Sequence, residues 1–191
     1  MQRKPITIEY TSTRVSRSIS YTLLLIALFA AAMHLHAPEA VRDRARRSAA
    51  AWLKGARYEG RDGVTLQTHA TNCGPAAMHM ALARLGIDRP LAEIEKTTGT
   101  DARGTSMFAL GQYAQQQGLH ASLWHLNMSD LIARRARPAI AFVEGNHFVL
   151  IDSIRQDGSV SLRDPAIGRL RMERAAFESI WRGQVILLDA P

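Results

Sequence analysis

The feature that most constrains the fold of this chain is a change of hydrophobic period near residue 118. Before that point apolar residues recur at the i, i+3, i+4 spacing of amphipathic helices, and after it short apolar runs are bounded by turn residues, as in strands. Helices followed by antiparallel strands are typical of an α+β fold. The expected helices are 73–85, 90–98, 106–117, 129–135 and 173–181, and the expected strands are 121–126, 138–143, 147–154, 159–163, 170–172 and 184–188.

The distribution of charge limits the class of partner. The net charge of +7 is concentrated in residues 1–59, which carry ten Lys/Arg against four Asp/Glu, whereas residues 60–191 carry fourteen against thirteen. The chain of 191 residues is long enough for one domain with additional segments. Because the part expected to be globular is nearly neutral and has no basic stripe, we expect no nucleic-acid partner.

An apolar stretch precedes the predicted domain. Residues 19–36 are predicted to form a transmembrane signal anchor, behind a basic polar tail at 1–18 and ahead of an Ala/Arg-rich helical stalk at 37–58. A cleaved signal peptide is the alternative, with a small-x-small site at Ala30–Ala32. Basic residues flank both ends of the stretch, but a short leading tail usually stays inside, which would place the domain 59–191 on the far side of the membrane.

The only cysteine, Cys73, stands at the start of the first predicted helix, with Asn72 as the expected N-cap. The apolar stripe of that helix is Met78, Ala81, Leu82 and Leu85. Unpaired backbone N–H groups and the positive end of the helix dipole favour a thiolate there and lower the pKa of the thiol. A lone cysteine is often only a small buried apolar residue, so a catalytic role depends on partners elsewhere in the chain.

Two residues of the predicted sheet have the chemistry of such partners. His147 opens the strand 147–154, and Asp164 closes the next strand across a hairpin turn at 156–158. Antiparallel pairing brings the beginning of one strand beside the end of the next, so the two side chains should be neighbours. A carboxylate beside an imidazole fixes its tautomer, and an imidazolium beside Cys73 gives an ion-pair nucleophile.

Gln67, six residues before Cys73, completes the predicted site. Its amide and the backbone N–H of Cys73 would bind the oxyanion that forms when Cys73 attacks a carbonyl. His147 would hold and then donate the proton to the leaving amine, and Asp164 would orient His147. No metal or cofactor is expected, because no HxxxH or similar pair occurs among the seven histidines.

These residues belong to a set of motifs that resembles a known family. The set is Gln67-x5-Cys73-Gly74-Pro75-Ala76, GTDARGTS at 99–106, PAIAFV followed by His147-Phe148-Val149-Leu150, Asp164-Pro165-Ala166-x-Gly168, and Phe177 to Trp181 with Gly183. Together they resemble the bacteriocin-processing cysteine peptidases over about residues 64–188. The resemblance implies a papain-like fold with N-terminal helices packed on a C-terminal antiparallel sheet, a catalytic Cys73, His147 and Asp164, and Gln67 in the oxyanion hole.

The resemblance also implies a substrate and a location. Family members cut leader peptides after a Gly-Gly pair, so we expect an exported or secreted polypeptide substrate that carries such a leader. Many members are fused to an ABC transporter, whereas this chain has no GxxxxGK[ST] motif, so a separate exporter is the expected partner. The chain resembles a stand-alone, single-pass member of the bacterial inner membrane with a periplasmic domain. It departs from the family at Asn72, where an acidic residue is common.

Two other functions use the same residues and stay open. The domain could be a non-catalytic peptide-binding module of a secretion or assembly machine, for which Cys73 would not be needed. It could also be a papain-like acyl transferase, which shares the triad but resolves the acyl-enzyme with an amine in place of water.

Overall fold

The structure, a computed structural model, describes residues 21–28, 31, 37–134 and 138–190. The chain divides into two compact units at Asp43 and Arg44, and every described strand lies in the second unit. The helices from residue 39 onward are α2 (Glu39–Leu53), α3 (Cys73–Arg84), α4 (Leu91–Thr97), α5 (Met107–Gln116), α6 (Met128–Ala133) and α7 (Arg174–Ile180). The strands are β1 (Ala56–Gly60), β2 (His120–His125), β3 (Ala139–Val143), β4 (His147–Ile154), β5 (Val160–Asp164), β6 (Gly168–Met172) and β7 (Trp181–Asp189).

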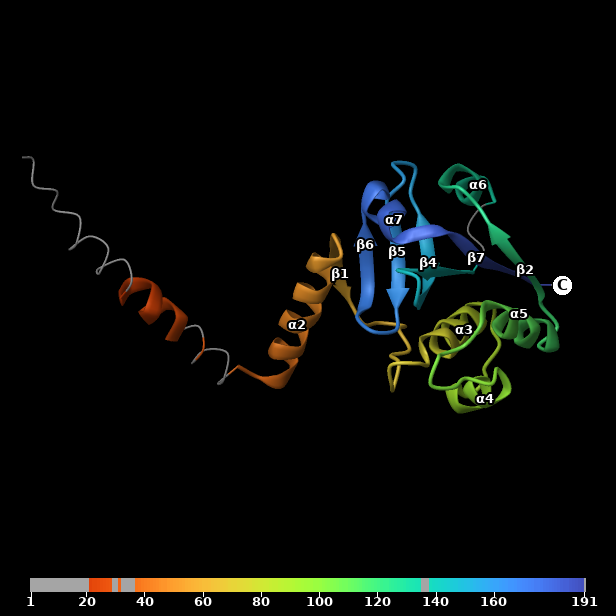
Figure 1. Cartoon of the computed structure of the whole chain (residues 1–191), viewed down its shortest axis with the longest axis horizontal. Helices are drawn as coiled ribbons and strands as arrows, with labels where there is room; N and C mark the ends of the chain where they lie inside the picture. The colour runs from red at the N-terminus through yellow and green to blue at the C-terminus, as the bar shows by residue number, and fades with distance from the viewer. Residues whose placement is uncertain (1–20, 29–30, 32–36, 135–137, 191) are drawn as a thin grey trace, which may run out of the picture. The chain divides into compact units, whose positions relative to one another are not determined.

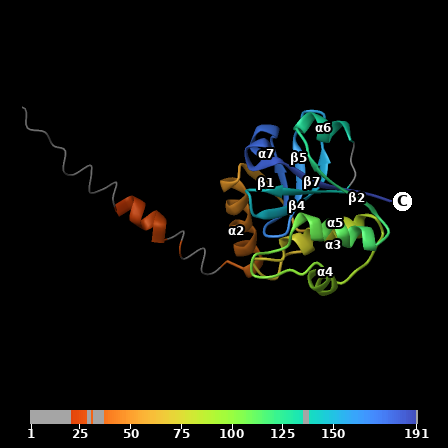
Figure 2. The same cartoon turned by 45° about the vertical axis from the view of Figure 1, so that its right-hand side comes forward.

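The described strands form one antiparallel sheet in the order β1-β6-β5-β4-β3-β7-β2. Its centre is a meander in which β4 pairs with β3 on one side and β5 on the other. Helices α3, α4 and α5 group on one side of the sheet, and α6 and α7 lie on the other (Figures 1 and 2). The sheet is therefore the middle layer of three in this unit.

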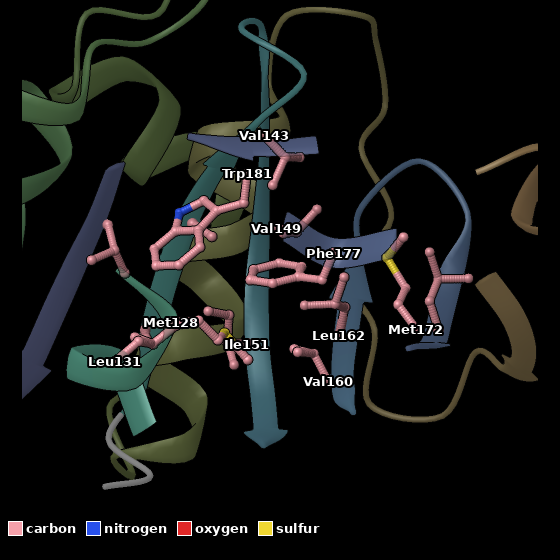
Figure 3. Close-up of a cluster of buried hydrophobic side chains, with 14 of the residues drawn as sticks. Met128, Leu131, Val143, Val149, Ile151, Val160, Leu162, Met172, Phe177 and Trp181 are labelled. Carbon is pink, nitrogen blue, oxygen red and sulfur yellow. The ribbon is translucent and has the colours of Figure 1, made fainter. Parts of the chain in front are cut away.

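Both faces of the sheet are buried, because successive side chains of a strand point to opposite faces. In β4, Phe148 and Leu150 belong to the apolar cluster that includes α3 and α5. Val149 and Ile151 belong to the other cluster, where they lie beside Phe177 of α7 (Figure 3). A central strand that is apolar on both faces holds its first residue in a fixed place, and that residue is His147.

The order of elements confirms the predicted α+β class. Strand β4 has the predicted bounds, and the ends of the other predicted elements shift by a few residues at most. The helix predicted at 129–135 spans Met128–Ala133, and Asn127 is its N-cap: the side-chain oxygen of Asn127 accepts a hydrogen bond from Asp130 N at 2.8 Å. Asn127 has the extended backbone that an N-cap needs, whereas Ser129 lies inside the helix.

Strand β1 and the end of α2 lie where the sequence predicts the end of a stalk and the start of the domain. The predicted boundary between 58 and 59 falls inside β1, which pairs with β6 at the edge of the sheet. Ala51 of α2 has no exposed surface and belongs to the core, and the guanidinium of Arg47 donates to the carbonyl oxygen of Ile167 at 2.8 Å. The residues of β1 do not alternate between buried and exposed, since only Ala56 is buried, so their pattern does not predict a strand. The strand is held by its backbone pairing with β6.

The N-terminal predictions fall mostly outside the described residues. The tail 1–18 is not described. Of the predicted anchor 19–36, only residues 21–28 and 31 are described, and they are helical. Among the described residues, no helix combines the length and the apolar character needed to cross a bilayer. The membrane anchor therefore stays a prediction.

Candidate active site

Cys73 is the first residue of α3, as the sequence predicts, and only 6% of its surface is exposed. Met78 and Leu82 on the same helix are fully buried and hold α3 against the sheet. The contact is tight at the next position, where a Cβ added to Gly74 would come within 3.2 Å of the side chains of Leu110 and Phe148. Gly74 thus lets the cysteine end of α3 approach β4 closely.

Asn72 does not cap α3 with its side chain, contrary to the expectation. The side chain is fully buried and turns back onto the preceding loop, where its oxygen accepts from Thr68 N at 3.2 Å and from His69 N at 3.4 Å. Its amide nitrogen donates to Thr68 Oγ1 at 2.9 Å and to Glu95 Oε2 of α4 at 3.2 Å. The N–H groups at the start of α3 therefore have no side-chain cap from Asn72, and the positive end of the helix dipole lies at Cys73.

His147 and Asp164 lie together, as the hairpin predicts. The ring nitrogen Nε2 of His147 donates to Asp164 Oδ1 at 2.8 Å. The same carboxylate oxygen accepts from Ala166 N at 2.7 Å, which fixes its position. Only 13% of the His147 side chain and 2% of the Asp164 side chain are exposed. Because Nε2 is engaged by the carboxylate, Nδ1 is the ring nitrogen left for Cys73.

The three groups shift one another's pKa toward an ion pair. Burial alone would raise the pKa of the Cys73 thiol, but the hydrogen bond and charge of His147 and backbone N–H groups of Phe148 and Gly74 leave it below its ordinary value. Burial alone would lower the pKa of His147, but Asp164 and Cys73 raise it to about 9. Burial opposes ionisation of Asp164 as well, but the hydrogen bond and charge of His147, the backbone N–H of Ala166 and the charge of Lys54 together outweigh burial and lower the pKa of Asp164. Thiolate, imidazolium and carboxylate are the mutually favoured charge states.

Gln67 lies beside the same hairpin but its side chain is held by the loop. Its backbone N–H donates to the carbonyl oxygen of Pro165, the residue after Asp164, at 2.9 Å. The side-chain nitrogen Nε2 donates to the carbonyl oxygen of His69 at 3.1 Å, and the side-chain oxygen is buried without a hydrogen-bond partner among the described residues. An amide nitrogen carries two N–H groups, so one of them remains for an oxyanion.

A cleft of about 320 Å³ opens beside Cys73. Its walls include Phe142 and Phe148, whose rings pack with centroids 4.8 Å apart. A second hollow of about 420 Å³ follows the loop 99–106 and shares Arg103, Gly104 and Thr105 with the first. The two hollows therefore adjoin each other at these three residues, and only the first is lined by Cys73. The residues that line the first are Ala70, Thr71, Cys73, Arg103, Gly104, Thr105, Phe142, Gly145, Asn146 and Phe148.

The sequence does not predict the role of His69 and Glu95 beside the site. Nε2 of His69 donates to Glu95 Oε1 at 2.5 Å, although the two residues are 26 positions apart. No local pattern signals a contact between a loop and a short helix at that separation. The one sequence feature that draws attention to this loop is the position of Asn72 immediately before Cys73. Within the described part of the chain, no group of three or more His, Cys, Asp or Glu side chains is arranged to hold a metal ion.

Comparison with known sequences identifies relatives over this same region. A family model described as the peptidase C39 family matches residues 61–191. An uncharacterized protein of Methanothermobacter thermautotrophicus is 33% identical over 135 residues, which cover 69% of this chain and 92% of that protein. The lactococcin-G-processing and transport ATP-binding protein LagD of Lactococcus lactis is 24% identical over 133 residues, which cover 67% of this chain and 19% of that protein.

Solved structures share the fold. The crystal structure of a double glycine motif protease from an AMS/PCAT transporter, in complex with the leader peptide, has a TM-score of 0.64 at 24% identity and covers 70% of this chain and 96% of that one. The peptidase domain of Streptococcus ComA, a bi-functional ABC transporter, has a TM-score of 0.63 at 20% identity and covers 67% and 98%. These likenesses confirm the predicted arrangement of N-terminal helices on a C-terminal antiparallel sheet.

Proposed function

Since the chain belongs to the peptidase C39 family, we propose that it is a cysteine endopeptidase that cleaves an exported or secreted polypeptide with Cys73, His147, Asp164 and Gln67. The observation that carries this proposal is the hydrogen bond from His147 Nε2 to Asp164 Oδ1 at 2.8 Å, together with a Cys73 thiol at the start of α3 whose pKa His147 helps to lower. A peptide-binding module would have no use for a thiol whose pKa is lowered by a buried, oriented histidine.

The proposed reaction follows from the charge states of these groups. The Cys73 thiolate attacks the scissile carbonyl carbon, and the oxyanion receives hydrogen bonds from the second N–H of Gln67 and the backbone N–H of Cys73. The His147 imidazolium gives its proton to the leaving amine, which breaks the peptide bond and leaves a thioester. Neutral His147 then takes a proton from water, the hydroxide attacks the thioester, and Cys73 leaves as a thiolate.

The proposed substrate carries a leader that ends in Gly-Gly. Relatives named as a double glycine motif protease and as a lactococcin-G-processing protein support this class of substrate. The cleft beside Cys73 supports it as well, because Phe142 and Phe148 wall it while Gly104 and Gly145 line it without side chains of their own. Residues without side chains suit a narrow, flat segment of peptide such as Gly-Gly.

A peptide cleavage assay tests the proposal. The full chain, solubilised in detergent, is incubated with a synthetic peptide that contains a leader-like helix, Gly-Gly and a short C-terminal extension. We expect one cut after Gly-Gly, seen by mass spectrometry as two fragments that together gain one water, and no cut by the Cys73→Ala variant. Cleavage by Cys73→Ala would overturn the assignment of the nucleophile. Transfer of the leader to added hydroxylamine without any hydrolysis would instead make the protein an acyl transferase.

The proposed location is the bacterial inner membrane, with the domain in the periplasm and a separate exporter supplying the substrate. The support is the apolar stretch 19–36 and the basic residues around it. Fractionation of cells that express the full chain, and of cells that express a chain without residues 1–36, tests this. We expect the full chain in the membrane fraction and accessible to protease in spheroplasts. Recovery of the full chain from the soluble fraction would overturn the anchor.

A further inference from the structure

A single carboxylate on α4 ties together the loop that leads into Cys73. Glu95 Oε1 accepts from Nε2 of His69 at 2.5 Å, and Glu95 Oε2 accepts from Nδ2 of Asn72 at 3.2 Å. The other ring nitrogen of His69, Nδ1, lies 3.1 Å from the hydroxyl of Thr71. The loop between Gln67 and Cys73 has no regular secondary structure, so these side-chain bonds are what hold its shape.

The loop in turn holds Gln67. The carbonyl oxygen of His69 is the acceptor for Gln67 Nε2 at 3.1 Å. The backbone N–H of His69 is bonded to the oxygen of Asn72 at 3.4 Å, so Asn72 and Glu95 fix both the backbone and the ring of His69. A shift of that carbonyl would turn the Gln67 amide, and with it the second N–H that is proposed to bind the oxyanion. A shift of about 1 Å in such a group is enough to reduce catalysis strongly.

Asn72 and Glu95 are matched in hydrogen-bonding capacity. All four bonds that an asparagine side chain can make are formed: its oxygen accepts two and its nitrogen donates two, one of them to Glu95. An aspartate at position 72 would place a second carboxylate against Glu95 at the same 3.2 Å. Two carboxylates at that distance repel each other unless one of them is protonated. The identity of residue 72 therefore depends on residue 95.

We propose that Glu95 is a positioning residue for the oxyanion hole, acting on Gln67 through His69 and Asn72. The inference rests on the proposed function, because it assigns a role within the same reaction. The carboxylate of Glu95 bonds to His69 and to Asn72, the residue before Cys73, and no bond from it to Cys73, His147 or Asp164 is found among the described residues. Loss of Glu95 should thus affect reactions that pass through an oxyanion and spare reactions of the thiolate that do not.

Two small reagents separate these effects without a peptide substrate. p-Nitrophenyl acetate acylates Cys73 through a tetrahedral oxyanion and releases p-nitrophenolate, whereas iodoacetamide alkylates the thiolate by direct displacement. In Glu95→Ala we expect acylation to slow by about tenfold, a fraction of what full loss of an oxyanion donor costs, with alkylation unchanged. Glu93→Ala is the matched control, because Glu93 lies on the same helix and accepts from Tyr113, away from the loop. We expect neither rate to change in that control.

A double variant decides whether Glu95 acts through Gln67. In a Gln67→Ala background, Glu95→Ala should cause no further loss of acylation rate, because the group that it positions is already gone. Losses that multiply, or acylation and alkylation that fall together, would overturn the proposal and make Glu95 a general structural residue. Because neither reagent is a peptide, failure to find a cleaved peptide would count against the proposed function alone.

A charge exchange provides a second test that is independent of alanine substitutions. Asn72→Asp should slow acylation through repulsion between the carboxylates, and Asn72→Asp with Glu95→Gln should restore it, because the new amide can donate to the new carboxylate. Melting curves of both variants show whether they fold. If Asn72→Asp acylates at the wild-type rate, or if the pair is no faster than Asn72→Asp alone, the matched pair does not exist and the proposal is overturned.

Discussion

The two sides of Cys73 are built by different means. On one side, His147 and Asp164 stand at the ends of two paired strands, and the backbone ladder of β4 and β5 sets their spacing. On the other side, Gln67 is followed by an irregular loop in which side chains bond to other side chains. In the proposed reaction, the hairpin side activates the nucleophile and the loop side stabilises the oxyanion.

Because the two sides are built differently, we expect them to differ in how well they tolerate the substitution of a single side chain. The His147 and Asp164 side chains are almost fully enclosed by the core, whereas the side chain of His69 in the loop is 46% exposed. A ladder of backbone bonds and a packed core resist the loss of a single side chain. A set of side-chain bonds in a half-exposed loop does not. Substitutions on the hairpin side should act through charge, and those on the loop side should act through position.

The largest effect is expected from Asp164→Ala. It removes the acceptor that orients His147 and the negative charge that favours the imidazolium, so we expect kcat to fall by a factor on the order of 10⁴. The Asp164→Asn variant is the isosteric companion, and it should also lose turnover severely while the fold stays intact, because an amide favours the wrong tautomer of the imidazole. Steady-state kinetics on a cleaved peptide and thermal melts of both variants measure this. Wild-type-like activity in Asp164→Asn would show that another residue orients His147.

Substitution of Gln67 is expected to have the next largest effect. Loss of one oxyanion donor costs roughly 10²–10³ in kcat, so Gln67→Ala should fall in that range with little change in KM. Gln67→Glu should be at least as damaging, since it keeps the shape but places a negative charge where negative charge develops. If both variants keep the wild-type kcat and fold normally, the loop side has no part in the oxyanion hole, while the triad assignment would stand.

The pH profile separates the two sides with a smaller effect. The ion pair exists between the lowered pKa of Cys73 and the pKa of His147 at about 9, so activity should rise through the first and fall above the second. By pH 10 the rate should have dropped about tenfold. Asp164→Asn lowers the pKa of His147 and should move the falling limb to lower pH. Gln67→Ala should move neither limb. A shift of either limb in that variant would mean that Gln67 also affects the pKa of Cys73 or His147.

The same contrast explains what could be predicted from the sequence. The approach of His147 and Asp164 follows from a turn at 156–158 and from strand pairing, which are local signals with a fixed geometric consequence. The side-chain bonds of Asn72 could not be predicted, because its capping role competes with a bond to Thr68 and with a bond to Glu95 that exists only after α4 has packed. Where the backbone sets position, local pattern is sufficient, and where side chains compete for partners it is not.

The start of the domain illustrates the same limit. The helix 39–53 has an Ala/Arg-rich sequence that is typical of a solvated connection, yet Ala51 is buried and Arg47 bonds to the turn before β6. Alanine is compatible with either environment, since it costs little to expose and little to bury. The sequence could predict the helix but not which face of it meets the sheet.

The smallest expected effect comes from weakening each side by one hydrogen bond. Thr68→Val removes the acceptor of the Asn72 amide on the loop side, and Asp157→Ala removes the acceptor of Ser159 N in the hairpin turn. One lost bond is worth about 0.5–1.5 kcal/mol, so if it displaces Gln67 the kcat of Thr68→Val should fall by a few-fold. Asp157→Ala should lower the melting temperature slightly and leave kcat within about twofold, because the strands beyond the turn keep their register.

The pair of variants is informative because the same kind of change should appear in different measurements. A loop that positions a catalytic group by side-chain bonds transmits the loss of one bond to turnover, whereas a hairpin inside a packed sheet absorbs it as a loss of stability. Thermal melts and steady-state kinetics on both variants measure this directly. If Thr68→Val loses only stability, or if Asp157→Ala loses only turnover, the two sides of Cys73 are not built differently, and the positioning role given to Asn72 and Glu95 would lose its physical basis.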